Sequence, residues 1–155
     1  MPVDGWTNIH FQHRNVDDVE LTVRSVTKSN LHHWVQDGNE DVQKQEGKLL
    51  LKKTIAVDNT PDKMMRSTIN LKEQIPKREA GIYQVSVKDP KSNSVSHLTV
   101  QVTDMNLITK RYPLDGGAEM VATWVLNART NDPISKVDMS IVSSSGETTS
   151  TCTSD

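Results

Sequence analysis

Residues 80–111 read AGIYQVSVKDPKSNSVSHLTVQVTDMNLITKR, and this stretch decides the fold. Apolar and polar side chains alternate on both sides of a turn-forming cluster, DPKSN, at residues 89–93. A period of two is typical of β-strands that bury one face. The alternation stops at Thr103-Asp104 and starts again at Leu107. The stretch therefore predicts a hairpin that closes one β-sandwich, followed at once by the first strand of another.

The residues before this hairpin carry further strand signals. Alternation predicts strands at residues 6–12, 18–27, 49–57 and 65–71. Between them, SNLHHWVQ at residues 29–36 predicts a short helix with Ser29 as its N-cap. We expect seven strands in about a hundred residues, which is the size of an immunoglobulin-like sandwich. Residues 1–102 are therefore predicted to form one complete domain.

Residues 103–155 are predicted to begin a second sandwich. Strands are expected at residues 107–111, 119–128, 137–141 and 148–153. Residues 119–128 are apolar on both faces, so this strand is expected at the centre of its sheet, with Trp124 in the core. Four strands do not close a sandwich, so the second domain is predicted to be truncated. The open edge is expected to be covered by another chain or to self-associate.

Composition narrows the classes of partner. The 155 residues carry a net charge of −2 with a pI near 6.2, which supplies no field for binding phosphates, so nucleic acid is not an expected partner. No apolar run approaches the ~20 residues that span a bilayer, so no membrane insertion is expected. The opening residues MPVDGWT do not resemble a signal peptide, which suggests an internal fragment.

The sequence predicts no catalytic, cofactor-binding or metal-binding residues. His10 and His13 should lie on opposite faces, His32-His33 cannot converge on a helix, and His97 is isolated. Cys152 is the single cysteine, and the sequence indicates no basic residue that would activate its thiol. We interpret the remaining polar, glycine and methionine features as structural: solvated acidic pairs at Asp17-Asp18 and Glu40-Asp41, turns at Gly116-Gly117 and Ser143–Gly146, and methionines that fill gaps in the core.

Several segments together resemble one known family. Val102–Leu107 (VTDMNL), followed by Lys110-Arg111-Tyr112-Pro113, resembles the joint between consecutive macroglobulin-like domains of the bacterial alpha-2-macroglobulins. The resemblance covers nearly the whole chain and includes segments elsewhere in the sequence: Phe11–Leu21, Gly81-Ile82-Tyr83, Ala128–Val137 and Glu147–Asp155. It implies two consecutive macroglobulin-like β-sandwiches, in an all-β chain with at most one short helix.

The chain also departs from the family pattern. Asn106 stands where the family has glycine, and Asn131-Asp132 replaces Gly-Lys in a turn, although asparagine also tolerates a positive φ. Nothing resembles the thioester Cys-x-Glu-Gln, because Cys152 is followed by Thr153-Ser154-Asp155, and no bait-like segment is recognisable. Protease trapping, the activity implied for whole family members, cannot reside in this piece.

The resemblance implies a non-catalytic scaffold fragment of a broad-spectrum protease inhibitor. Its partners would be neighbouring domains of the parent protein, with proteases met only through the full-length protein. Such parents are periplasmic and often anchored to the inner membrane. The alternative is an immunoglobulin-like stalk or adhesion module of a bacterial cell-surface protein, because A-x-T-x-x-P-I-x-x-V also occurs in such repeats. An enzyme's accessory domain is a third hypothesis, but Trp6, Trp34 and Trp124 are too scattered for a carbohydrate-binding strip.

Overall fold

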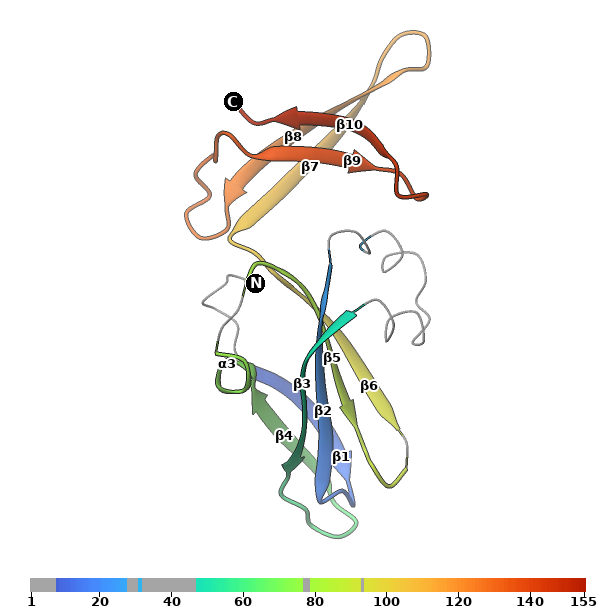
Figure 1. Ribbon diagram of the computed structural model, residues 1–155, viewed down its shortest axis with the longest axis vertical. Coiled ribbons are helices and arrows are strands. Elements are labelled where there is room, and N and C mark those ends of the chain that lie inside the picture. Colours follow the sequence, from blue (N-terminus) through green and yellow to red (C-terminus); the bar gives the residue numbers. More distant parts are fainter. Residues whose placement is uncertain (1–7, 28–30, 32–46, 77–78, 93) are drawn as a thin grey trace. The chain divides into compact units, whose positions relative to one another are not determined.

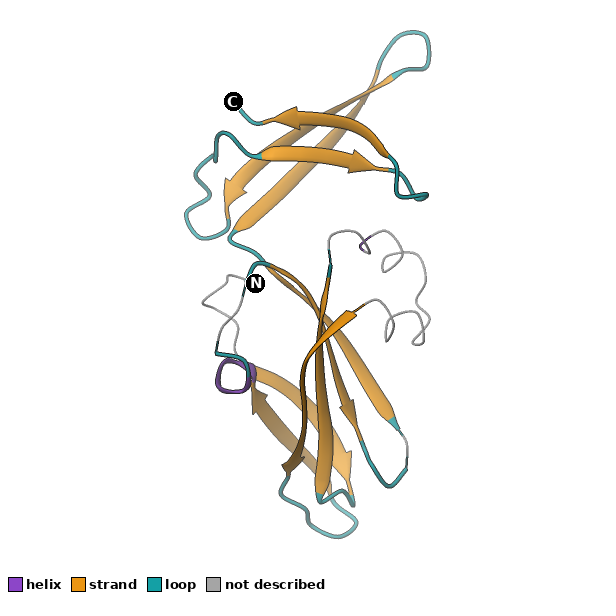
Figure 2. Cartoon of the chain, in the orientation of Figure 1, coloured by secondary structure: helices purple, strands orange, loops and turns teal. Residues whose placement is uncertain are grey.

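The computed structural model describes residues 8–27, 31, 47–76, 79–92 and 94–155. Strands dominate this part of the chain (Figures 1 and 2). Its elements are β1 (Asn8–Arg14), β2 (Asp18–Val26), β3 (Gly47–Ala56), β4 (Met64–Asn70), α3 (Leu71–Gln74), β5 (Gly81–Lys88), β6 (Val95–Val102), β7 (Met105–Pro113), β8 (Glu119–Asn127), β9 (Asp138–Val142) and β10 (Thr148–Thr153). The prediction of an all-β fold is confirmed. None of the helices in the described ranges is long and apolar enough to cross a membrane.

The chain divides into two compact units that meet at Val102 and Thr103. The identity of these units as one complete and one truncated domain stays a prediction. In the first unit the described residues contain six strands, which match the six ranges predicted as strands, although the stated total was seven. The helix predicted at residues 29–36 lies outside the described residues except for Leu31, so it stays a prediction.

The short helix α3 was missed, because Leu71 was assigned to the preceding strand. Asn70 caps this helix: its Oδ1 accepts a hydrogen bond from the Lys72 backbone N–H at 3.0 Å, and its Nδ2 donates to Glu73 Oε1 at 2.8 Å. Asparagine is among the preferred N-cap residues, so the signal was present in the sequence. Leu71 stays in the core at 2% exposure, which explains why it fits the alternation of β4.

Two antiparallel sheets build the first unit. The larger has the strand order β3-β2-β5-β6 and the smaller consists of β1 and β4. Their buried residues form one cluster, made of Ile9, Val16, Val19, Leu21, Val23, Ile69, Leu71, Ile75, Tyr83, Val85, Val100 and Val102. The cluster draws on both sheets, so the unit is a β-sandwich with its core between them.

The register of the larger sheet explains which side chains fill that core. Leu21 lies opposite Val87 and Val23 opposite Val85, so the alternate residues of β2 and β5 share one face. Leu21 and Val23 are completely buried. The inward alternation predicted for residues 18–27 is thus confirmed, and each buried side chain of this size contributes about 1.5–3 kcal/mol to folding.

The second unit consists of two hairpins. β7 pairs with β8 over their whole length, and β9 pairs with β10 with a register shift between Thr148 and Ser150. Gly116 and Gly117 have φ values of 84° and 81° in the β7–β8 turn, as predicted for this pair. Asn131, with φ of 60°, likewise adopts the left-handed conformation that asparagine tolerates in this turn.

Two expectations for the second unit, and one for the methionines of both units, are wrong. Among the described residues β8 is not central, since it pairs with β7 on one edge and otherwise makes only an isolated bridge, Leu126 to Pro133. Trp124 is 47% exposed rather than in the core. The methionines do not fill gaps as a group, because Met64, Met105 and Met120 are exposed. A two-stranded ribbon has a second face that only another layer can bury, so apolar periodicity on both faces does not by itself make a strand central.

Candidate functional site

The described histidines are held by hydroxyl groups on neighbouring strands. His10 Nδ1 lies 2.9 Å from Thr68 Oγ1, and His97 Nδ1 lies 2.9 Å from Ser86 Oγ. His10 is exposed while His13 is buried, so the two point to opposite faces of β1 as predicted. His32 and His33 lie outside the described residues. Within the described ranges, no three His, Cys, Asp or Glu side chains are grouped to hold a metal ion.

His13 is the most unusual of these side chains. It is 8% exposed, and its Nε2 lies 2.8 Å from Ser67 Oγ on β4. Its Nδ1 is buried and has no hydrogen-bond partner among the described residues. The Phe11 ring lies 5.6 Å away, centroid to centroid. A buried ring nitrogen without a partner is costly, and this burial distinguishes His13 from the exposed His10 and His97.

His13 lies beside a groove of about 230 Å³ between β1 and the β5–β6 hairpin. Apolar and polar side chains share its lining: Phe11, Gln12, His13, Arg14, Val16, Val19, Val87, Asp89, Ser92, Ser94 and Ser96. Asp89 is bound by its own turn, because Ser92 Oγ and the Lys91 backbone N–H both donate to its carboxylate. The Ser92 hydrogen bond is the main reason that the pKa of Asp89 is lowered. The groove was not foreseen, because its walls come from strands about eighty residues apart in the sequence.

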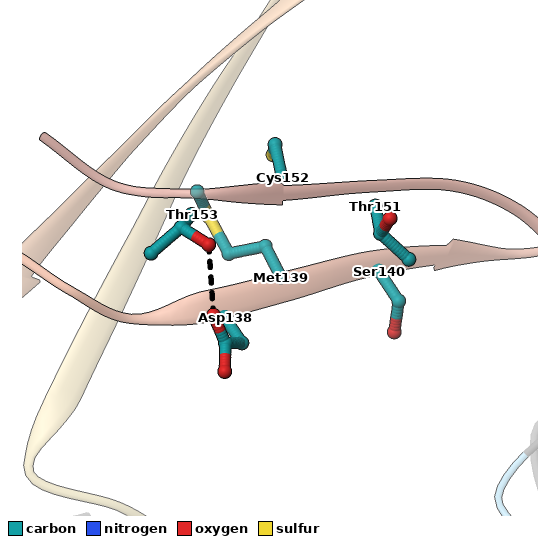
Figure 3. Close-up of a pocket in the computed structure, with 6 residues that line it drawn as sticks. All are labelled: Asp138, Met139, Ser140, Thr151, Cys152 and Thr153. Carbon is teal, nitrogen blue, oxygen red and sulfur yellow. Dashed lines mark hydrogen bonds between the residues drawn. The ribbon is translucent and has the colours of Figure 1, made fainter.

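A second hollow of about 440 Å³ lies along the β9–β10 hairpin (Figure 3). Its lining comes from the two paired strands alone: Asp138, Met139, Ser140, Thr151, Cys152 and Thr153. Cys152 is exposed and lies opposite Met139, while Thr153 Oγ1 donates to Asp138 Oδ1 at 2.8 Å. None of these six side chains is a histidine or lysine that could activate the thiol, so the hollow offers no nucleophilic chemistry.

One acidic residue of the first unit, Asp17, connects three turns through its carboxylate. Lys91 Nζ donates to Asp17 Oδ2 at 2.8 Å, and Asn59 Nδ2 donates to Asp17 Oδ1 at 2.9 Å. These bonds, the Lys91 bond first, lower the pKa of Asp17. The Asp17 carboxylate in turn raises the pKa of Lys91. The prediction that Asp17 is solvated is correct, but this charge also connects distant turns.

The residues of the predicted joint make local structural bonds. The Met105 backbone N–H donates to Thr103 Oγ1 at 3.1 Å, and the Ala128 backbone N–H donates to the Asp104 carbonyl at 2.8 Å. The Asp104 and Arg129 side chains form an ion pair at 3.8 Å. Thr103 and Asp104 thus connect the start of β7 to the residues that follow β8, which is a structural role.

The described residues therefore show no constellation for catalysis. Ser143 accepts from the Glu147 backbone N–H at 3.1 Å in the β9–β10 turn, which is the turn role predicted for it. The remaining candidate features are on the surface: the groove beside His13 and the exposed apolar side chains of the second unit.

Comparison with solved structures identifies the fold. The chain is similar to a crystal structure of native alpha-2-macroglobulin from Escherichia coli spanning domains MG0-NIE-MG1, with a TM-score of 0.71 and 14% identity over 96% of this chain and 49% of that one. A crystal structure of the same protein spanning NIE-MG1 gives a TM-score of 0.70 and 15% identity over 94% of this chain and 73% of that one. The cryo-EM reconstruction of its native conformation gives 0.65 and 13% identity over 96% of this chain and 10% of that one.

The likeness covers both units but only part of the other protein. This chain spans about half of the first of these structures and a tenth of the third. The resemblance read from the sequence is thus confirmed at the level of fold. No family model matches the chain, and no curated protein sequence matches it.

Proposed function

We propose that this chain is a non-catalytic scaffold segment of a bacterial alpha-2-macroglobulin-like protease inhibitor. The observation that carries the proposal is the extent of the likeness, which includes 96% of the chain and so both of its units. A single sandwich occurs in many unrelated proteins. Two consecutive units with this topology, joined by a Thr103-Asp104 motif, are a more specific combination.

The chemistry of the chain agrees with a scaffold role. Its described polar groups are used mainly to hold turns and strand ends, as at Asn70, Asp89 and Ser143. The core of the first unit is one apolar cluster shared by its two sheets, and close-packed interiors of this kind are rigid. Rigid bodies of this kind keep distant parts of a large protein in position, and trapping would belong to the assembled whole.

The remaining parts of the proposal concern the parent protein. Its neighbouring domains are the proposed partners of this chain, and proteases would be engaged only by the complete protein. A periplasmic location of the parent, which the family resemblance of the sequence implies, is part of the same proposal. We propose no enzymatic activity, cofactor or metal for this segment.

The test is to determine the coding sequence on both sides of Met1–Asp155 and to assay the full-length product. We expect further sandwich domains in the frame and a product that blocks protease action on a large protein substrate. A small peptide substrate should still be cleaved, because a cage excludes large molecules and admits small ones. Inhibition of both substrates alike would indicate an active-site inhibitor and would contradict the proposal.

The flanking sequence also separates this function from its alternative. Near-identical tandem copies of this chain, with no protection of the large substrate, would support a cell-surface stalk module. Divergent sandwiches with protection would support the protease trap.

A further inference from the structure

We draw no further inference here: the strongest candidate, the groove beside His13 between β1 and the β5–β6 hairpin, carries none, because nothing in the described residues shows what occupies it.

Discussion

Lys91 and Asp17 are 74 positions apart in the sequence, and their side chains meet at 2.8 Å. The bond joins the β1–β2 turn to the β5–β6 turn, and Asn59 attaches the β3–β4 loop to the same carboxylate. Arg14 and Asp62 form a neighbouring ion pair at 3.6 Å. Both partners in each pair are largely exposed, so these pairs fix the arrangement of the turns more than they stabilise the fold.

The Asp17 interaction predicts how stability depends on pH. The folded-state pKa of Asp17 lies below its ordinary value of 3.8, chiefly because of the Lys91 bond. The stabilisation is therefore complete above pH 3.8 and is lost as the pH falls through the folded pKa. The folded-state pKa of Lys91 is raised above 10.5, so its contribution is complete below that pH and is lost as the pH rises through the raised value.

The measurement is urea unfolding of the parent chain and of Asp17→Asn across the pH range. The difference between them should be constant between about pH 5 and 9 and should shrink towards acid pH. Asp58→Asn, an exposed neighbour, is the control. A difference that grows on acidification would show that Asp17 does not act through its charged form.

Truncation of a buried side chain in the core of the first unit is expected to lower the free energy of unfolding strongly. Leu21 is completely buried between the sheets, so Leu21→Ala should lower the free energy of unfolding by about 2–5 kcal/mol. Thr22→Ala, on the opposite face of β2, should cost less than about 1 kcal/mol. Urea unfolding followed by circular dichroism measures both. Equal costs would mean that the inward face of β2 has been misassigned.

These residues also show how much the sequence could predict. Alternation is a local property, so β2, β5 and β6 were found from their own residues, and the break at Thr103-Asp104 was found in the same way. The short helix α3 was missed because Leu71 satisfies the strand period and the helix period at once. Which residues are buried was predicted well only where a second layer covers the strand.

The surface features could not be predicted from the sequence, because they depend on contacts between distant strands. The exposure of Trp124 depends on what lies against β8, which the pattern of β8 does not record. The groove beside His13 depends on the unequal width of two sheets, and that width follows from pairing between distant strands. The strand was predicted to end at residue 12, with His13 in the turn that follows, whereas His13 belongs to β1 and is buried.

The apolar face of the β7–β8 ribbon predicts self-association. Ile108 lies opposite Trp124, and these side chains are 53% and 47% exposed. Exposed apolar side chains that adjoin in this way favour burial against another surface. We expect sedimentation velocity to show association that increases with concentration. Ile108→Lys should weaken it, while Thr109→Lys on the other face should not; a chain that stays monomeric throughout would contradict this prediction.

Cys152 is expected to be replaceable without loss of stability. Its thiol is exposed on β10, so Cys152→Ser should leave the free energy of unfolding unchanged within about 0.5 kcal/mol. The native chain should also react fully with a thiol reagent before any denaturant is added. Met139→Ser, on the paired strand, is a useful comparison, because Met139 is only partly exposed and its loss should cost more than the loss of the thiol. A fall in yield or stability with Cys152→Ser would show that the thiol is buried in solution, and that β10 packs against a surface on its Cys152 face.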